Sequence, residues 1–357
     1  MQNKTQITSY LSLAFCLLLL SCNKSEKINE VPDFGKMIQA TPRHSVLESD
    51  EYWIWGASMV QTDDGICHLF YSRWPKSGPF SDWLFHSEIA YATAKNPDGP
   101  YSFQKVIIKG SKPGAWYNKW AHNPHIKKFK DKYYLYFVSH NTSDFGDGKR
   151  QNYTFSQRIG VAVADNPAGT WTVCDEPIVD LQAGKAAHGY VTNPSVCERP
   201  DGSYLMIFKS RPENWKEIKG FTSIHCVATS PTPQGPFSIA ENPILTEATA
   251  EDPFLWCQDG KYFAIVDDQY GDYIGFKGLA LFESLDGINW NASKHPLVSK
   301  VQILWDDQTL MPLKHLERPQ LWFDKDGKPA ILFCAVQTQN KEGELNSFNV
   351  HIPLKNK

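Results

Sequence analysis

Short apolar runs separated by turn residues recur along most of the chain. In the segment 250–266, an Asp-Pro pair opens one apolar run, an Asp-Gly turn follows, and a second apolar run continues to Val266. Two apolar runs joined by Asp-Gly are typical of a β-hairpin, because this dipeptide accepts the left-handed backbone of a tight turn. No amphipathic helix of three turns is evident between residues 52 and 352. The pattern therefore predicts strands.

This pattern is repeated five times. Four copies align on Asn123, Asn193, Asp252 and Glu317, at spacings of 70, 59 and 65 residues, and a degenerate first copy lies near Ala57. Most units also contain a third apolar run that ends in a turn. Repetition at this period with several strands per unit is typical of propeller blades. We therefore predict an all-β protein, a five-bladed β-propeller formed by one domain over residues 47–357.

The N-terminal residues indicate export. Lys4 precedes an apolar segment, residues 10–20, which is too short to span a bilayer and is typical of a signal-peptide core. The following Leu-Leu-Ser-Cys, ending at Cys22, resembles a bacterial lipobox. We therefore expect a lipoprotein signal peptide over residues 1–21 and lipidation of Cys22. The protein would be a membrane-anchored lipoprotein of the cell envelope, on its periplasmic or surface face. The alternative is an ordinary cleaved signal with an incidental cysteine.

Residues 22–46 differ in character from the repeats. They are mostly polar and contain Pro32 and Pro42. Such a composition is typical of a semi-flexible spacer. We therefore expect a tether between the anchor and the propeller.

Composition excludes one class of partner and favours another. The formal net charge is −3 and the lysines are scattered, so nucleic acid is not expected to bind. Aromatic residues make up 13% of the chain, with 12 Trp. Trp and Tyr rings stack on sugars, although they serve equally well as core residues. A carbohydrate partner is therefore consistent with the composition.

The cysteines give no sign of a metal or a cofactor. Apart from Cys16 and Cys22, six remain: Cys67, Cys174, Cys197, Cys226, Cys257 and Cys334. No pair has zinc-like Cys-x-x-Cys spacing, and most lie inside apolar runs. Free, buried thiols are the expected state, because a chain of this size can bury a core without disulfides. We expect no metal and no cofactor.

The repeated unit resembles a known group of enzymes. Innermost strands that open with a polar residue, often before proline, and continue as in residues 131–137 and 259–263 resemble the five-bladed β-propeller glycoside hydrolases, family 43 and its relatives. The resemblance covers nearly all of the mature chain. It implies hydrolysis of an oligo- or polysaccharide fragment by paired carboxylates. In those enzymes, acids come from the first blade, the second blade and a later blade.

This chain departs from that pattern. The equivalent positions are Gly56 or Ala57 in blade one, Asn123 in blade two and Asn193 in blade three. Only blades four and five keep acids there, in Glu251-Asp252 and Glu317. Either the catalytic set has moved, or the protein is a non-catalytic surface glycan-binding lipoprotein.

For a moved site we predict Asp252 and Glu317 as the catalytic pair, with Glu88 as a third candidate. Innermost strands converge on the propeller axis, so acids at their openings would meet there. Glycoside hydrolysis needs one protonated and one ionised carboxyl, about 5–5.5 Å apart for retention or about 6.5–9.5 Å for inversion. Crowding two acids in a dry pocket separates their pKa values. The alternative is structural: Asp252 makes an Asx turn and Glu317 pairs with Arg318.

Further polar and aromatic residues are candidates for binding the sugar. The predicted substrate-binding residues are Asn123, His122, Asn193, Arg73, Lys209, Arg318 and Trp55. For the cations, the alternative role is an ion pair with a neighbouring acid. Long loops on one face would close the pocket and favour exo action on chain ends.

Overall fold

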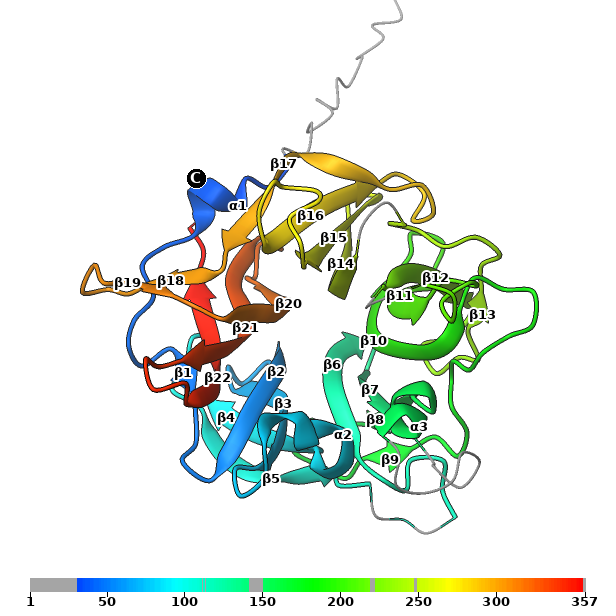
Figure 1. The fold of residues 1–357 in the computed structure, drawn as a ribbon, viewed down its shortest axis with the longest axis horizontal. Coiled ribbons are helices and arrows are strands. Elements are labelled where there is room, and N and C mark those ends of the chain that lie inside the picture. The colour runs from blue at the N-terminus through cyan, green and yellow to red at the C-terminus, as the bar shows by residue number, and fades with distance from the viewer. Residues whose placement is uncertain are drawn as a thin grey trace, which may run out of the picture. The chain divides into compact units, whose positions relative to one another are not determined.

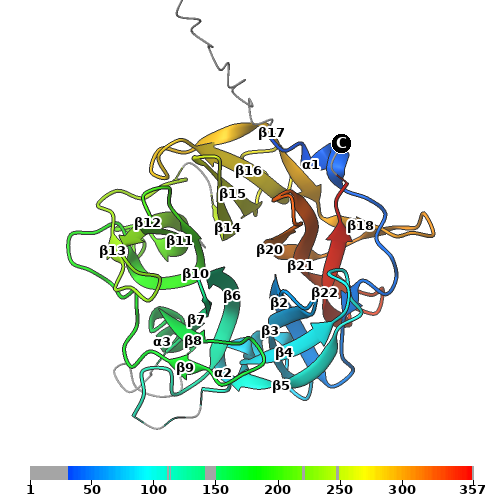
Figure 2. The ribbon, with the colours of Figure 1, turned by 180° about the vertical axis from the view of Figure 1, so that it is seen from behind.

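The computed structural model describes residues 31–110, 112, 114–140, 150–218, 222–246 and 249–355. The expected signal peptide, Cys22 and the first part of the expected tether lie outside the described residues. Figures 1 and 2 show the rest from opposite faces as a ring of five sheets, with β2, β6, β10, β14 and β20 innermost.

Each sheet has four antiparallel strands, which confirms the predicted five-bladed β-propeller. Blade one contains β2 (Tyr52–Gln61), β3 (Cys67–Pro75), β4 (Glu88–Ala94) and β5 (Ser102–Ile108). Blade two contains β6 (Ala121–Phe129), β7 (Lys132–Ser139), β8 (Arg158–Ala164) and β9 (Thr172–Val173). Blade three contains β10 (His188–Glu198), β11 (Tyr204–Arg211), β12 (Ile224–Ser230) and β13 (Ser238–Ile239). Blade four contains β14 (Ala250–Gln258), β15 (Lys261–Asp268), β16 (Gly278–Ser284) and β17 (Asn291–Lys300).

Blade five is closed by the N-terminal part of the chain. It contains β20 (His315–Phe323), β21 (Pro329–Gln339), β22 (Leu345–Pro353) and, as its outermost strand, β1 (Val46–Leu47). A small ribbon of β18 (Gln302–Leu304) and β19 (Leu310–Pro312) precedes this blade. Because β1 pairs with β22, the first and last parts of the described chain share one sheet.

The hairpin predicted for blade four is present. β14 and β15 are joined by Asp259 and Gly260, which have φ angles of 50° and 78°. Both values lie in the left-handed region that a tight hairpin turn needs. The strands then pair in register, with Phe254 opposite Ile265.

Each innermost strand kinks at the repeated position. Asn123, Asn193, Asp252 and Arg318 have φ angles of 51°, 56°, 53° and 55°, and Gly56 has 48°. The pairing of every innermost strand shifts register there, as at a β-bulge. In blade five the repeated position is therefore Arg318. The alignment on Glu317 was wrong by one residue.

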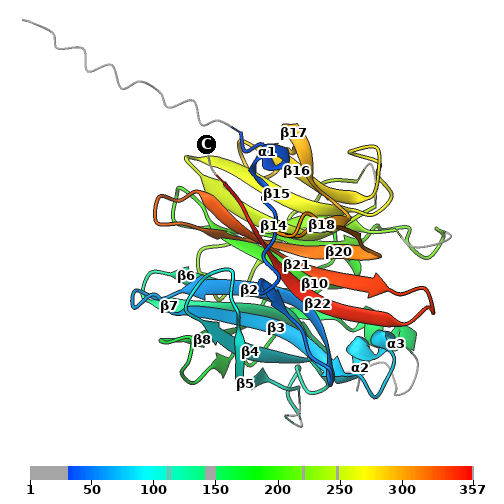
Figure 3. The same ribbon diagram turned by 90° about the vertical axis from the view of Figure 1, so that its left-hand side faces the viewer.

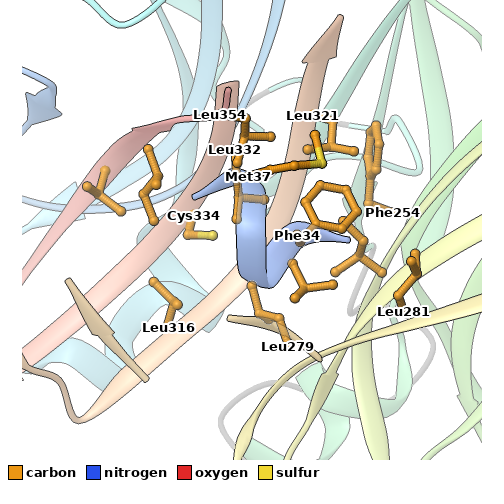
Figure 4. Close-up of a cluster of buried hydrophobic side chains, with 14 of the residues drawn as sticks. Phe34, Met37, Phe254, Leu279, Leu281, Leu316, Leu321, Leu332, Cys334 and Leu354 are labelled. Carbon is orange, nitrogen blue, oxygen red and sulfur yellow. The ribbon is translucent and has the colours of Figure 1, made fainter. Parts of the chain in front are cut away.

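Residues 31–46 pack on the propeller, so the tether expectation is wrong for this part. Phe34 and Met37, in the short helix α1 (Phe34–Met37), lie in the core cluster of blades four and five. Figure 4 shows both side chains among Leu279, Leu316 and Leu332. Burying a Phe side chain contributes about 1.5–3 kcal/mol, which favours docking over free motion.

The remaining core lies between neighbouring blades. One apolar cluster joins blades two and three, with Tyr136 and Ile159 on one side and Val196 and Met206 on the other. The six cysteines named above are free.

Three short helical segments stand on one face. These are η1 (Phe80–Asp82), α2 (Trp83–His86) and α3 (Arg150–Phe155). Figure 3 shows α2 and α3 side by side at this face, where the ring centroids of Phe85 and Tyr153 are 4.7 Å apart. No helix in the described part of the chain is long and apolar enough to cross a membrane.

Candidate active site

A cavity of about 330 Å³ lies where the innermost strands begin, around the propeller axis. Residues of all five blades line it, together with Trp83 of α2 and Phe155 of α3. Its wall on blades four and five carries the carboxyl groups of Glu251, Asp252 and Glu317. We call this space the axial cavity.

Hydrogen bonds connect the repeated positions around the axis. Asn123 Nδ2 donates to Asn193 Oδ1 at 2.6 Å, and Asn193 Nδ2 donates to Asp252 Oδ1. Arg318 Nη1 donates to the same Asp252 oxygen at 3.3 Å. A Cβ at Gly56 would lie only 3.3 Å from Cγ of Arg318. The absence of a side chain at Gly56 therefore leaves room for Arg318.

Both oxygens of Asp252 accept hydrogen bonds from the protein. Besides the two bonds to Oδ1, the backbone N–H of Arg318 donates to Oδ2 at 3.2 Å. The side chains of Asp252 and Arg318 are 4% and 1% exposed. Asp252 lies in the cavity wall, as expected from the sequence, and there it fixes the position of Arg318.

The guanidinium of Arg318 has donors left over. Its Nε and Nη2 atoms are buried and have no hydrogen-bond partner among the described residues. Buried donors without partners are costly, so a ligand oxygen in the axial cavity would stabilise them. Arg318 therefore fits the predicted substrate-binding role.

Glu251 is buried beside Lys209. Lys209 Nζ lies 2.8 Å from Glu251 Oε1, and the two side chains are 11% and 13% exposed. Burial raises the pKa of Glu251, and the nearby Asp252 and Glu317 raise it further against the opposing charge of Lys209. This environment favours the protonated form of Glu251. The sequence prediction placed the acid one residue later, at Asp252.

Glu317 has the opposite tendency. Burial acts to raise its pKa, but the hydrogen bond from His315 and the charges of His315, Lys277 and Lys209 outweigh it and lower the pKa. Lys277 Nζ lies 3.9 Å from Glu317 Oε1, and His315 Nδ1 contacts the same oxygen. Glu317 is therefore held in the ionised form.

A fourth acid, Asp267, lies directly opposite Glu251 on the neighbouring strand β15. It is fully buried at the end of β15, and its Oδ1 has no partner in the described part of the chain. Burial and the charge of Glu317 raise its pKa well above the usual value. The run of apolar residues before it in β15 was the signal for burial.

The wall of the axial cavity on blade one and on the helical segments after β3 is aromatic. Trp55, Trp74, Phe80 and Trp83 line it. The Trp83 ring stacks on His122 with centroids 4.9 Å apart. Trp55 is therefore placed as predicted, within a larger aromatic surface that can contact the faces of a sugar ring.

His122 also lines the axial cavity, as expected. Its Nδ1 lies 2.7 Å from Oγ of Ser87. Burial lowers the pKa of His122 well below its usual value, and the charges of Arg318 and Lys209 lower it further. A neutral imidazole at this place can hydrogen-bond a sugar hydroxyl.

The structure does not bring Glu88 or Arg73 to the axial cavity. They face each other on β3 and β4, with Arg73 Nε donating to Glu88 Oε1 at 2.9 Å. The Arg73 guanidinium lies 4.2 Å from the ring centroids of both Tyr52 and Phe103. Neither residue lines the cavity, so their placement in the site was wrong. The physical reason is that successive side chains of a strand project to opposite faces of the sheet: Trp74 on β3 lines the cavity, so Arg73 before it, with its cross-strand partner Glu88, lies on the other face.

The structure thus brings together most of the predicted residues. Those in the axial cavity are Asp252, Glu317, Asn123, Asn193, His122, Lys209, Arg318 and Trp55. Sequence reasoning missed the roles of Glu251, Lys277 and His315. Within the described residues, no group of three or more His, Cys, Asp or Glu side chains could hold a metal ion.

Comparison with solved structures finds the same propeller elsewhere. A family 117 glycoside hydrolase from the marine bacterium Zobellia galactanivorans matches with a TM-score of 0.62 and 16% identity, over 89% of this chain and 88% of that one. A thermostable family-43 glycoside hydrolase matches with a TM-score of 0.60 and 11% identity, over 89% and 96%.

An alpha-L-arabinofuranosidase from Lactobacillus brevis matches with a TM-score of 0.57 and 14% identity, over 88% of this chain and 92% of that one. No family model matches the chain, and no curated protein resembles it in sequence. At these identities the likeness shows a shared fold.

Proposed function

We propose that this protein is a glycoside hydrolase that acts on an oligo- or polysaccharide fragment. One observation carries the proposal: the axial cavity holds two carboxyl groups, Glu251 and Glu317, whose surroundings push their pKa values in opposite directions. Such a separation supplies the acid and the base of glycosidic hydrolysis. The aromatic part of the cavity wall suits a sugar ring, and the fold shared with glycoside hydrolases supports the proposal.

Glu251 takes the role of general acid in this scheme. It gives its proton to the glycosidic oxygen while the bond from that oxygen to the anomeric carbon breaks. Glu317, ionised, either removes a proton from the attacking water or bonds to the anomeric carbon first. The anomeric form of the product distinguishes these two courses. Asp252 is a positioning residue here, because it holds Arg318 against the cavity.

Exo action fits the position of the axial cavity. Trp83 of α2 and Phe155 of α3 line it, and their helices lie side by side. A cavity of about 330 Å³ holds about one or two sugar rings. We therefore propose release of a terminal sugar from a chain end.

A glycan-binding protein without catalysis is the second candidate. It is favoured by Gly56, Asn123 and Asn193, because none of these repeated positions carries an acid. Incubation with plant and algal oligosaccharides separates the two, with released sugar measured by chromatography. Hydrolysis that Glu251→Gln abolishes supports the first function. Binding without release at high protein concentration would leave only the second.

For the N-terminal segment we propose export and anchoring through Cys22. The support is the apolar stretch of residues 10–20 followed by the lipobox-like sequence. One acyl chain gives only marginal membrane binding, whereas two or more chains on the cysteine give stable attachment. The wild-type protein should partition into detergent and take up labelled lipid, and Cys22→Ala should do neither. A soluble wild-type protein with another N-terminus would refute the anchor.

A further inference from the structure

A second cavity opens beside the axial cavity, between blades two and three. It has a volume of about 560 Å³ and is lined by Arg158 at the start of β8, by residues 181–184 and 187–189, and by Trp215 and Lys216 after β11. We call it the side groove. None of the residues named above for catalysis belongs to it.

The side groove adjoins the axial cavity. Phe155 at the end of α3 lines both spaces. Its ring lies 4.4 Å from the Trp215 ring, which faces the side groove, and 6.2 Å from the Tyr190 ring, which faces the axial cavity. In Figure 1, α3 lies beside β10. An aromatic surface therefore leads from one space to the other.

Small residues open the floor of the side groove. A Cβ at Gly189 would lie 3.4 Å from Cε2 of Trp215, so the backbone there approaches the indole closely. A Cβ at Gly184 would meet no atom within 4 Å. The Trp215 indole thus packs against the backbone at Gly189, while the space beside Gly184 stays open to a ligand. Aromatic faces supported in this way are suited to stacking on sugar rings.

The charge of the side groove differs from that of the axial cavity. Its described lining contains the basic residues Arg158, His188 and Lys216 and no acid. Lys216 Nζ lies over the Trp215 ring, 5.5 Å from its centroid, which places a cation at the stacking surface. Arg158 is held in place because Nη1 donates to the backbone oxygens of Phe155 and Gln157, and its Nε pairs with Asp180. An anionic ligand is therefore favoured over a cationic one.

The proposed general acid lies on the same side. Glu251 pairs with Lys209 of β11, and β11 continues into the segment that carries Trp215. A general acid stands next to the leaving oxygen, so the leaving part of the chain points toward the acid. Glu251 itself lies on β14 of blade four, and its pairing with Lys209 puts the acid at the border with blade three, the blade on which the side groove opens.

We propose that the side groove binds the part of the glycan that leaves, and that it selects an acidic sugar, a uronate or a sulfated residue, stacked on Trp215 beside Lys216. This inference rests on the proposed function only for the direction of the chain, and the groove binds its ligand whether or not the bond is cleaved. The protein would then act on an acidic polysaccharide.

Binding by the full chain carrying Glu317→Gln tests the proposal without turnover. The probes are oligogalacturonides of two to five units, their methyl esters, and sulfated carrageenan oligosaccharides, measured by calorimetry and by Trp fluorescence. At least one acidic series should bind about tenfold more tightly than neutral chains, as expected for one added charge-assisted contact. Lys216→Glu should erase that preference, and Trp215→Phe should remove the fluorescence change.

Matched controls are available on the opposite face of the blades. Lys325→Glu alters an exposed lysine in the β20–β21 turn, and Leu285→Ala alters a side chain that is 81% exposed. Both should leave binding unchanged. Equal affinity for all probes, unaffected by Lys216→Glu, would overturn the side-groove proposal.

If the protein is not a hydrolase, the same experiments give a different result. Acidic chains would then bind in a Lys216-dependent manner while no glycan releases sugar with the wild-type protein. In the converse case, the wild-type protein releases sugar from neutral chains with a KM that Lys216→Glu does not change. That result would support the hydrolase function and contradict the side-groove proposal.

Discussion

Glu251 and Asp267 stand directly opposite each other on β14 and β15, so two acids share the buried end of one blade. Directly opposite residues project from the same face of a sheet, with Cβ atoms about 4.5–5.5 Å apart. Two carboxylates so close in a dry environment cannot both ionise cheaply. Burial raises the pKa of each, and most strongly that of Asp267, whose pKa the charges of Glu317, Asp252 and Glu251 raise further.

We predict that Asp267→Asn is well tolerated. The change replaces a protonated acid by a neutral side chain of the same shape, so the free energy of unfolding should change by about 1 kcal/mol or less. Asp252→Asn should cost about 3–5 kcal/mol, because it leaves the buried charge of Arg318 without its partner. Urea unfolding at pH 7 measures both. Equal losses in the two variants would mean that Asp267 is ionised.

The docked N-terminal segment gives a second prediction. Phe34 is fully buried, so Phe34→Ala should lower the free energy of unfolding by about 3–5 kcal/mol. The control is Lys36→Ala on the exposed side of the same helix, whose ion pair with Asp33 is worth at most about 1 kcal/mol. Urea unfolding compares the two. An unchanged midpoint for Phe34→Ala would restore the flexible tether for residues 31–46.

The fold could be predicted from sequence because its signals are local. Asp259-Gly260 marks a hairpin by itself, and the unit that contains it recurs at a nearly constant interval. The N-terminal segment was misjudged for the opposite reason. Phe34 and Met37 are two apolar residues in a polar stretch, and only the distant partners Leu279 and Leu332 make them core residues.

The site was predictable only in part. Converging strands bring Asp252 and Glu317 to one cavity, as the repeat implied. Whether Glu251 or Asp252 is the general acid depends on contacts across blades, because Asn193 and Arg318 donate hydrogen bonds to the carboxylate of Asp252. Sequence spacing carries no information on such pairings. The one-residue error at Arg318 had the same origin, because the bulge that defines the repeat is a backbone feature.

Buried histidines predict a loss of stability in acid. Burial lowers the pKa of His125, His140 and His225 to about 3. The unfolded chain titrates near 6.5, so between these values it binds more protons than the folded chain. Each histidine therefore removes about 1.4 kcal/mol per pH unit as the pH falls below about 6.5. Glu251 and Asp267, with raised pKa values, offset part of this loss.

His225 offers the sharpest test of that pH dependence. Neither ring nitrogen has a hydrogen-bond partner in the described part of the chain, and Lys209 lies opposite on the neighbouring strand. His225→Leu should reduce the slope of unfolding free energy against pH, measured by urea unfolding between pH 5 and pH 7. A slope identical to that of the wild type would mean that His225 is not buried in its neutral form.

The pH dependence of sugar release tests the proposed acid and base together. With Glu317 ionised and Glu251 protonated, activity should follow a bell shape, its acidic limb set by Glu317 and its alkaline limb by Glu251. Glu251→Gln and Glu317→Gln should each lose about 10²–10⁴-fold in turnover. Glu88→Gln, which alters a carboxylate outside the axial cavity, is the matched control and should retain turnover.

His315→Ala then separates the two limbs. The hydrogen bond and charge of His315 lower the pKa of Glu317, so their loss should raise that pKa. The acidic limb should therefore move to higher pH, while the alkaline limb stays where Glu251 puts it. Rates measured from pH 4 to pH 9 with the substrate found in the oligosaccharide panel show the shift. A moved alkaline limb, or an acidic limb that does not move, would contradict the assignment of Glu317 as the ionised group.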